Sequence, residues 1–326
     1  MINIHDIGIA ATSPGHFNQL QQLEQILARL QAIGCRLVEI DVAPFVLIMD
    51  GQVRQPQLED FLAVLRNFDL RYSVHCLNRL NLAYDPRHEL CRQIMLCYIE
   101  ICQAVGASHL VYHSGLQALD GVRYGVRRAL LTDEELASGA RQEVEAFRDL
   151  APVAADAGVI IGMENGDTHQ WEYNVIAQFG RPRSELFKHH RRLRIEPIVR
   201  QLEAIDHPNV AMTLDTAHLY IAAQALGFDY LEAVSEAAPW VKHLHISDNF
   251  GRLDHGFDSE PDRWAFGEAD IHLLPGWGSI PYRETFARLP DYDGDLILEI
   301  KPGFWDYLDE GLETMQSILD GLESKL

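Results

Sequence analysis

The sequence contains few basic residues for its acidic ones. Lysine and arginine together number 27, against 48 aspartates and glutamates, which gives a formal net charge of -21. A surface of this sign repels the phosphate backbone of nucleic acids unless a local basic patch intervenes. The composition therefore disfavours a nucleic-acid partner and favours a small-molecule substrate.

Cysteines, long apolar runs and glycine-rich loops are also scarce. The five cysteines form no CxxC pattern, so we expect reduced thiols in the core and no disulfide framework. No apolar run approaches the length of a membrane span, and the first ten residues lack the pattern of a signal peptide. We therefore expect a cytoplasmic protein with no membrane partner. No phosphate loop of the P-loop or dinucleotide type is present, so we expect no nucleotide cofactor.

What the chain does contain is a regular alternation of strand-like and helix-like segments. Several strand candidates are apolar throughout, as expected of parallel strands that are buried on both faces. Leucines spaced three or four apart, and a capping box of Thr132 and Glu135, predict helices between them. The predicted strands are Ile4–Ala10, Arg36–Val42, Leu70–His75, His109–His113, Val159–Glu164, Val210–Asp215, Val241–Ile246 and Leu296–Ile300.

Eight strands, each followed by a helix, predict a (β/α)8 TIM barrel, with residues 1–326 in a single domain. A doubly wound open sheet is the alternative, but it does not explain ligand-type residues converging from six strands. We expect two long loops at the mouth, at about 115–131 and 166–193, where loops set substrate choice. The second carries the basic run 188–192, which we expect to be a solvated helix or loop face.

Metal-binding types of residue lie at the ends of six predicted strands. The carboxyl ends of the strands of such a barrel meet at its mouth, so these residues are expected to converge. The last four strands contribute three carboxylates and one imidazole, a mostly oxygen site that suits Mn²⁺, Co²⁺, Mg²⁺ or Zn²⁺. Without a cation, their burial together carries a heavy cost of desolvation and repulsion. The six residues are His75, His113, Glu164, Asp215, His245 and Glu299.

Several motifs resemble those of the xylose-isomerase-like barrel superfamily, which includes sugar and sugar-phosphate isomerases and epimerases, a dehydratase and endonuclease IV. They are GMENG at 162–166, TLDTAH at 213–218, HLHISDN at 243–249, DIHLLPGWGSI at 270–280 and LILEIKP at 296–302. The resemblance implies that one divalent metal is held by Glu164, Asp215, His245 and Glu299. It also implies that the two glutamates act as acid and base, and that His218 contacts a substrate oxygen.

The resulting hypothesis is a metal-dependent isomerase or epimerase that acts on a sugar, sugar phosphate or polyol. A metal that chelates a carbonyl acidifies the adjacent C–H, and a nearby carboxylate can then remove the proton. We expect Mn²⁺ or Zn²⁺ as the metal, with Co²⁺ and Mg²⁺ as alternatives, and a carbohydrate-like substrate. The sequence does not determine the oligomeric state, and a homo-oligomer is one alternative. A lyase, dehydratase or carbon–carbon-cleaving enzyme is an alternative, because the same deprotonation begins each reaction.

An endonuclease with three zinc ions, like endonuclease IV, is a further alternative. It is suggested by five more residues that match that enzyme's ligand positions, namely His75, His113, His218, Asp270 and His272. The net charge and the sequence His113-Ser114-Gly115, in place of HPG, weigh against it. These residues are otherwise expected to bind substrate.

Other single residues are weaker candidates. We expect His16 to be a surface histidine, and His243 to face away from His245 and pack in the core. Glu39, Arg252, Trp277 and Lys301 are candidates for substrate contacts, with a supporting ion pair as the equal alternative for Glu39 and Lys301 and packing of the loop for Trp277.

Overall fold

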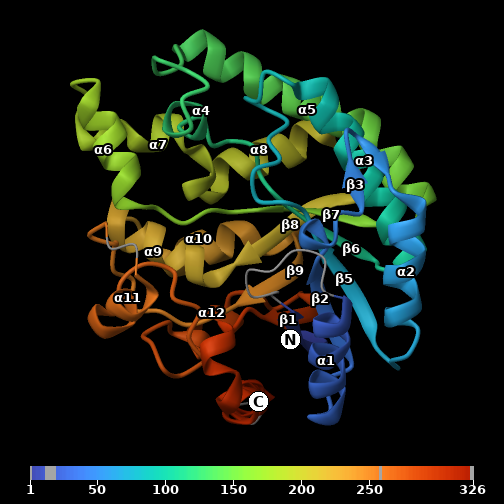
Figure 1. The fold of residues 1–326 in the computed structure, drawn as a ribbon. Helices are drawn as coiled ribbons and strands as arrows, with labels where there is room; N and C mark the ends of the chain where they lie inside the picture. The colour runs from blue at the N-terminus through green and yellow to red at the C-terminus, as the bar shows by residue number, and fades with distance from the viewer. Residues whose placement is uncertain (1, 12–19, 257–258, 324–326) are drawn as a thin grey trace.

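Eight parallel strands close into a barrel in this computed structural model, which describes residues 2–11, 20–256 and 259–323 (Figure 1). Around the barrel the strands follow the order β1-β10-β9-β8-β7-β6-β5-β2, and every neighbouring pair is parallel. The predicted (β/α)8 fold and its single domain are confirmed. The strands are β1 Asn3–Ala11, β2 Leu37–Asp41, β5 Arg71–His75, β6 His109–His113, β7 Ile160–Glu164, β8 Val210–Asp215, β9 Val241–Ile246 and β10 Asp293–Leu298.

The predicted strands agree with the observed ones except at the last. Strand β10 begins at Asp293 and ends at Leu298, so Glu299 follows the strand instead of lying inside it. A short hairpin of β3 (Ile48–Met49) and β4 (Gln52–Val53) lies outside the barrel and was not predicted.

Helices surround the barrel (Figure 1). The predicted capping box is present, because the Thr132 side chain accepts from the Glu135 N–H and the Glu135 side chain accepts from the Thr132 N–H. Gly106 ends α3 with φ 78°, a left-handed conformation that favours glycine. The helices around the barrel are α1 Leu20–Ala32, α2 Gln55–Leu65, α3 His88–Val105, α5 Asp133–Asp156, α8 Ile195–Ile205, α9 Thr216–Leu226, α10 Tyr230–Ala237, α12 Tyr282–Ala287 and α13 Leu308–Glu323.

The segments that follow β6 and β7 contain helices of their own. The first carries α4 (Asp120–Arg123), and the second, expected as a loop, carries α6 (Gln170–Gln178) and α7 (Leu186–His189). Buried apolar residues of both segments form a separate cluster together with Ala222 of α9. Its other members are Leu119, Tyr173, Ile176, Leu186 and Leu193. A further helix, α11 (Glu260–Phe266), follows β9.

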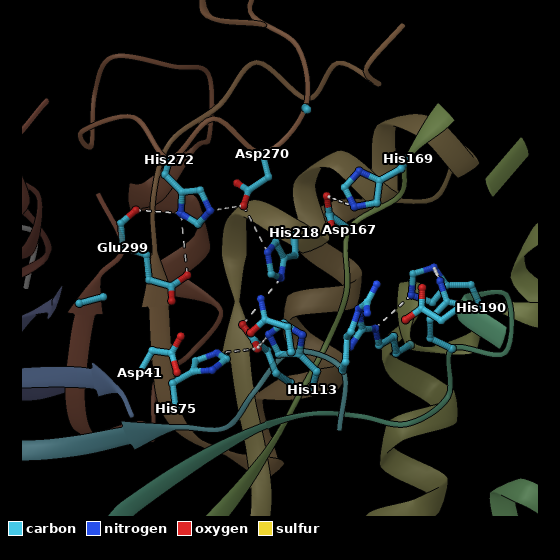
Figure 2. A pocket seen from close by; sticks show the side chains of 18 of the residues that line it. Asp41, His75, His113, Asp167, His169, His190, His218, Asp270, His272 and Glu299 are labelled. Carbon is cyan, nitrogen blue, oxygen red and sulfur yellow. Dashed lines mark hydrogen bonds and ion pairs between the residues drawn. The ribbon is translucent and has the colours of Figure 1, made fainter. Parts of the chain in front are cut away.

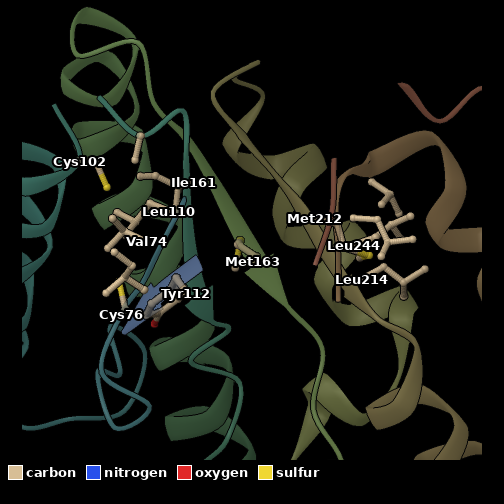
Figure 3. Close-up of a cluster of buried hydrophobic side chains, with 14 of the residues drawn as sticks. Val74, Cys76, Cys102, Leu110, Tyr112, Ile161, Met163, Met212, Leu214 and Leu244 are labelled. Carbon is tan, nitrogen blue, oxygen red and sulfur yellow. The ribbon is translucent and has the colours of Figure 1, made fainter. Parts of the chain in front are cut away.

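The apolar core lies between the barrel strands and the helices (Figure 3). Leu110 and Tyr112 of β6 are fully buried there, whereas the alternate residues His109 and His113 point to the barrel interior. All five cysteines are free and buried, as predicted. Within the ranges that the structure describes, no helix is long and apolar enough to cross a membrane.

Candidate metal centre at the barrel mouth

A pocket of about 440 Å³ opens at the carboxyl ends of the barrel strands (Figure 2). This volume lies in the range of about 300–1,000 Å³ that is typical of small-molecule sites. Charged and aromatic side chains line it, many of them from the two segments that follow β6 and β7. The strand-end residues that line the pocket are His75, His113, Glu164 and Glu299, together with Glu39, His218, Asp270, His272 and Lys301.

Four of the predicted metal ligands lie together at the base of this pocket. One atom from each of Glu164, Asp215, His245 and Glu299 falls within 4.8 Å of the others. Glu164 Oε1 lies 3.0 Å and Glu299 Oε1 lies 3.4 Å from His245 Nδ1. Because the four residues come from neighbouring strands β7 and β8, from β9 and from the end of β10, the closed barrel itself brings them together.

Asp215 provides the test of whether this group fits a cation. Its Oδ1 accepts from the His218 N–H at 2.7 Å, but its buried Oδ2 has no hydrogen-bond partner. Burial raises the pKa of Asp215 to about 7, and the nearby Glu299 adds to the effect although His218 opposes it. A buried carboxylate oxygen without a donor is costly, and a divalent cation would relieve that cost. The donor set and this oxygen therefore fit a metal ion.

Glu39 lies beneath this group, on the inner side of β2. Its Oε1 lies 3.0 Å from His245 Nε2, and its Oε2 lies 2.9 Å from His243 Nε2. Burial opposes ionisation of Glu39, but the charges and hydrogen bonds of the two histidines outweigh it and hold the pKa of Glu39 well below its usual range. His245 thus turns Nε2 toward Glu39 and Nδ1 toward Glu164 and Glu299, so Nδ1 is the nitrogen that faces the proposed metal ligands.

The expectation for His243 is therefore wrong. Residues two apart in a strand share a face, and His243 and His245 both point into the barrel toward Glu39. Glu39 is only 2% exposed, and one of its oxygens also forms a compact group with His75, His245 and Glu299. The structure thus places Glu39 against the ligand set.

His75 and His113 extend the site along β5 and β6. His113 Nε2 lies 2.9 Å and His75 Nε2 lies 3.7 Å from Glu164 Oε2, and the three residues form a second compact group. Burial lowers the pKa of His113 to about 4. For His75 burial acts in the same direction, but the hydrogen bond and charge of Glu164 outweigh it and raise the pKa to about 9. Glu164 therefore belongs to two adjoining groups.

Asp270, His218 and His272 form a third cluster on the other side (Figure 2). Asp270 Oδ2 lies 3.3 Å from His218 Nε2 and 2.6 Å from His272 Nε2. Asp270 Oδ1 is buried and has no hydrogen-bond partner. The outer residues predicted from the sequence are thus brought to the same pocket.

Two weaker candidates do not reach the pocket. Trp277 donates from Nε1 to Glu310 and packs on Phe304 and Tyr307, and the Arg252 guanidinium donates to the carbonyl of Phe266. Lys301 does line the pocket, but it pairs with Glu260 at 3.3 Å. His16 lies outside the described residues.

The basic run 188–192 is not the solvated face that we expect from the sequence. His189 and His190 are buried, and His190 Nδ1 lies 2.6 Å from Oε1 of the buried Glu172. Arg192 donates from Nε to His190 Nε2 and lines the pocket. The alternation of His190 and Arg192, two apart, was the available signal, but a charge run does not show which of its members face inward.

Comparison with known proteins agrees with the barrel fold. The sequence profile of the xylose isomerase-like TIM barrel family matches residues 27–318. No curated protein sequence matches the chain. One similar solved structure is a D-tagatose 3-epimerase-like protein, 17% identical with a TM-score of 0.67, over 98% of this chain and 99% of that chain.

Two further structures share the fold. A 3-keto-D-glucoside 4-epimerase from E. coli is 14% identical with a TM-score of 0.64, over 96% of this chain and 99% of that chain. The IOLI protein with a bound zinc atom is 16% identical with a TM-score of 0.62, over 98% of both chains. At these identities the likeness shows the fold alone. The family profile, however, spans the chain from α1 to α13, and the chain belongs to the xylose isomerase-like TIM barrel family.

Proposed function

We propose that this protein is a divalent-metal-dependent isomerase or epimerase that acts on a small carbohydrate-like molecule. The observation that carries the proposal is the convergence of Glu164, Asp215, His245 and Glu299 at the base of a pocket of metabolite size. The sugar epimerases and the zinc-bound protein among the similar structures support it. Zn²⁺ and Mn²⁺ suit this donor set best, because it combines an imidazole with carboxylates.

A metal bound by this group would polarise a substrate carbonyl and acidify the neighbouring C–H. The two glutamates would then handle the proton. Glu164 ends β7 and Glu299 follows β10, with β8 and β9 between them, so their carboxylates reach the group from different sides of the barrel. That separation suits removal of a proton at one face of a substrate carbon and its return at the other.

The surrounding histidines would hold the hydroxyl groups of the substrate. His218 and His272 line the pocket and flank Asp270, which accepts from both imidazoles. Burial lowers the pKa of both histidines, but Asp215 and Asp270 outweigh it for His218 and Asp270 outweighs it for His272, so the pKa of each is raised. The Nδ1 of each imidazole already faces a carbonyl, that of Asn165 or that of Glu299, so a sugar oxygen would bind by entering between Nε2 and Asp270.

A second candidate function is a hydrolase with several metal ions, as in the endonuclease alternative. It is favoured by the second group, in which His75 and His113 share Glu164 with the first, and by Asp270 with its two histidines. Metal analysis separates the candidates: about one ion per chain supports the isomerase, and about three support the hydrolase.

The isomerase is tested by proton exchange. Protein loaded with Zn²⁺ or Mn²⁺ is incubated in D₂O with a panel of ketoses and aldoses, and NMR follows loss of the C–H signal beside the carbonyl. The wild type is expected to exchange this proton without loss of substrate mass, whereas Glu299→Gln slows exchange by about 10²–10⁴-fold, the usual contribution of an acid–base group. The exposed Glu203 supplies a matched control, Glu203→Gln, with the wild-type rate.

Full exchange by Glu299→Gln, or a wild-type protein that binds no divalent metal, contradicts the proposal. A product that has lost water or been cleaved identifies the lyase alternative instead.

A further inference from the structure

Of the four arginines that line the pocket, three come from the segments after β5, β6 and β7, and the fourth, Arg263, comes from α11. We call Arg79, Arg123 and Arg192 the arginine wall. They come from the loop after β5, from α4 and from the turn after α7. In a chain with 48 acidic and 27 basic residues, such a grouping at one pocket is a departure from the overall charge.

Arg192 is held by a chain of buried groups. Glu172 is fully buried, and its Oε1 accepts from His190 Nδ1 at 2.6 Å and from Gln117 Nε2 at 2.6 Å. With its proton on Nδ1, His190 presents Nε2 as an acceptor to the Arg192 Nε–H at 3.1 Å. The guanidinium is thus fixed through Nε. Among the described residues, its outer nitrogens have only one weak contact, with the Ser114 carbonyl at 3.5 Å.

Arg79 and Arg123 are held by aromatic rings. Arg79 lies over the Tyr124 ring at 3.3 Å, and Arg123 lies over the Trp171 ring at 4.2 Å. A guanidinium stacked in this way keeps its N–H edge available for a bidentate contact with an oxyanion.

The arginine wall has no carboxylate partner of its own among the residues that the structure describes. Asp120 lies one turn before Arg123 on α4 and lines the same pocket, but no ion pair joins the two. Lys301, which lines the pocket as well, is by contrast paired with Glu260. Three guanidinium groups that face one cavity and are paired with no carboxylate repel each other, and a bound anion would relieve this repulsion.

The backbone makes this wall a fixed surface. The Ala118 N–H donates to the His189 carbonyl and the Arg191 N–H donates to the Leu116 carbonyl, both at 2.8 Å. Gly166 N–H donates to the Arg192 carbonyl at 3.0 Å. These bonds join the segments after β6 and β7, so the arginines they carry are positioned before any ligand arrives.

The arginine wall and the metal group lie apart in the pocket. Figure 2 shows His190, which holds Arg192, on the opposite side from Glu299 of the metal group and from His272. We propose that the arginine wall binds an anionic group, a phosphate or a carboxylate, on a carbohydrate-like substrate whose carbonyl end faces the metal group. This inference rests on the proposed function and names the substrate class for the same site.

Calorimetric titration of the zinc-loaded full-length protein tests it with three probes: D-fructose, D-fructose 6-phosphate and D-glucuronate. The phosphorylated or the carboxylated sugar is expected to bind at least about tenfold more tightly than neutral fructose, the order of one charge-assisted contact. Preference for one of the two anionic sugars distinguishes phosphate from carboxylate recognition.

The exposed Arg123 is changed in Arg123→Ala and the half-buried Arg192 in Arg192→Gln. Each is expected to lose about tenfold or more in affinity for the anionic sugar, a larger loss than for fructose, with zinc content unchanged. Arg128→Ala is the matched control, because Arg128 is exposed on the same segment as Arg123 but lies outside this pocket. Equal binding of neutral and anionic sugars, or an anion preference that survives both substitutions, overturns the inference.

The two proposals fail in different ways. Proton exchange on neutral sugars without any anion preference leaves the isomerase standing and removes the arginine wall as a binding site. Tight, arginine-dependent binding of an anionic sugar without proton exchange in D₂O supports the arginine wall as a binding site and contradicts the isomerase.

Discussion

At the bottom of the barrel buried carboxylates pair with arginine, whereas at the mouth they pair with histidine. Arg71, the first residue of β5, donates to both oxygens of Asp295 at 2.7 and 3.0 Å and to Asp6 at 2.7 Å. At the mouth the contacts of Glu164 within ion-pair distance are all histidines: His75, His113, His218 and His245.

The difference lies in what each counter-charge can become. Arginine stays protonated at any physiological pH and accepts nothing, so its pairs are permanent structural links. Histidine can release its proton and offer a lone pair to a metal. The charge of carboxylates surrounded by histidines can therefore be balanced either by protonated imidazoles or by a bound cation. Carboxylates paired with arginine keep the guanidinium as their counter-charge. The kind of counter-charge thus distinguishes a site from a structural ion pair in the same barrel.

The largest expected effect comes from replacing one buried aspartate at each end. At pH 8 in metal-free protein, Asp215→Asn is expected to stabilise the fold by about 2–4 kcal/mol, because ionisation of this buried group is unfavourable. Its pKa is raised from 3.8 to about 7, so the cost grows as the pH rises through that window. Asp295→Asn is expected to destabilise by about 1–3 kcal/mol, because it removes a bidentate partner of Arg71. Urea unfolding measures both.

With zinc bound, Asp215→Asn should be less stable than wild type, since it removes a proposed ligand and with it most of the stabilisation by the metal. The comparison breaks if the two substitutions change the free energy of unfolding in the same direction without metal.

A smaller effect is expected one layer below the metal group. Glu39→Gln removes the charge that holds His245, and it should weaken Zn²⁺ binding by about 10–100-fold, the usual cost of losing an outer partner of a metal-binding histidine. Competition with a fluorescent chelator measures the affinity. Glu143→Gln is the control: Glu143 is equally buried but pairs with Tyr112 and Gly115, and its loss should leave the zinc affinity as it is. Unchanged zinc affinity in Glu39→Gln would show that Glu39 does not act through His245.

The smallest effect concerns the layer between the two ends. His109 stacks on His243 with ring centroids 4.9 Å apart. Burial, and then the charge of His243, lowers its pKa from 6.5 to about 3. The unfolded chain therefore takes up a proton first, so the wild type loses stability as the pH falls from 6.5 toward 3.

His109→Gln should remove this dependence, and its free energy of unfolding relative to wild type should rise by about 1.4 kcal/mol per pH unit across that window. Urea unfolding at pH 6.5, 5.5 and 4.5 checks it, with the exposed His88→Gln as the reference. A parallel pH dependence in His109→Gln and wild type would contradict the assignment.

Most of the barrel was predictable because its strands are short apolar runs between helix-like segments. A run such as VIIGME is apolar and ends in a carboxylate, so it predicts both the buried strand and the position of Glu164 at its carboxyl end. Convergence of Glu164, Asp215, His245 and Glu299 then follows from closure of the sheet.

The parts that escaped prediction depend on contacts distant in sequence. Buried Tyr173 and Ile176 of α6 fall at helical spacing, yet their burial requires Leu119 from another segment. The inward turn of Arg192 likewise depends on Glu172, twenty residues earlier. For Trp277 the sequence left sugar stacking and packing of the loop as equal alternatives, and the structure shows it packed on Phe304 and Tyr307.

The hydrogen bonds between Ala118 and His189 and between Leu116 and Arg191 have a consequence for the redesign of this enzyme scaffold. Residues 115–131 and 166–193 behave as one insert attached to the barrel at two places. A chimaera that borrows only one of them from a relative would expose unpaired amides and the apolar cluster beneath. The two segments should therefore be transplanted as a pair.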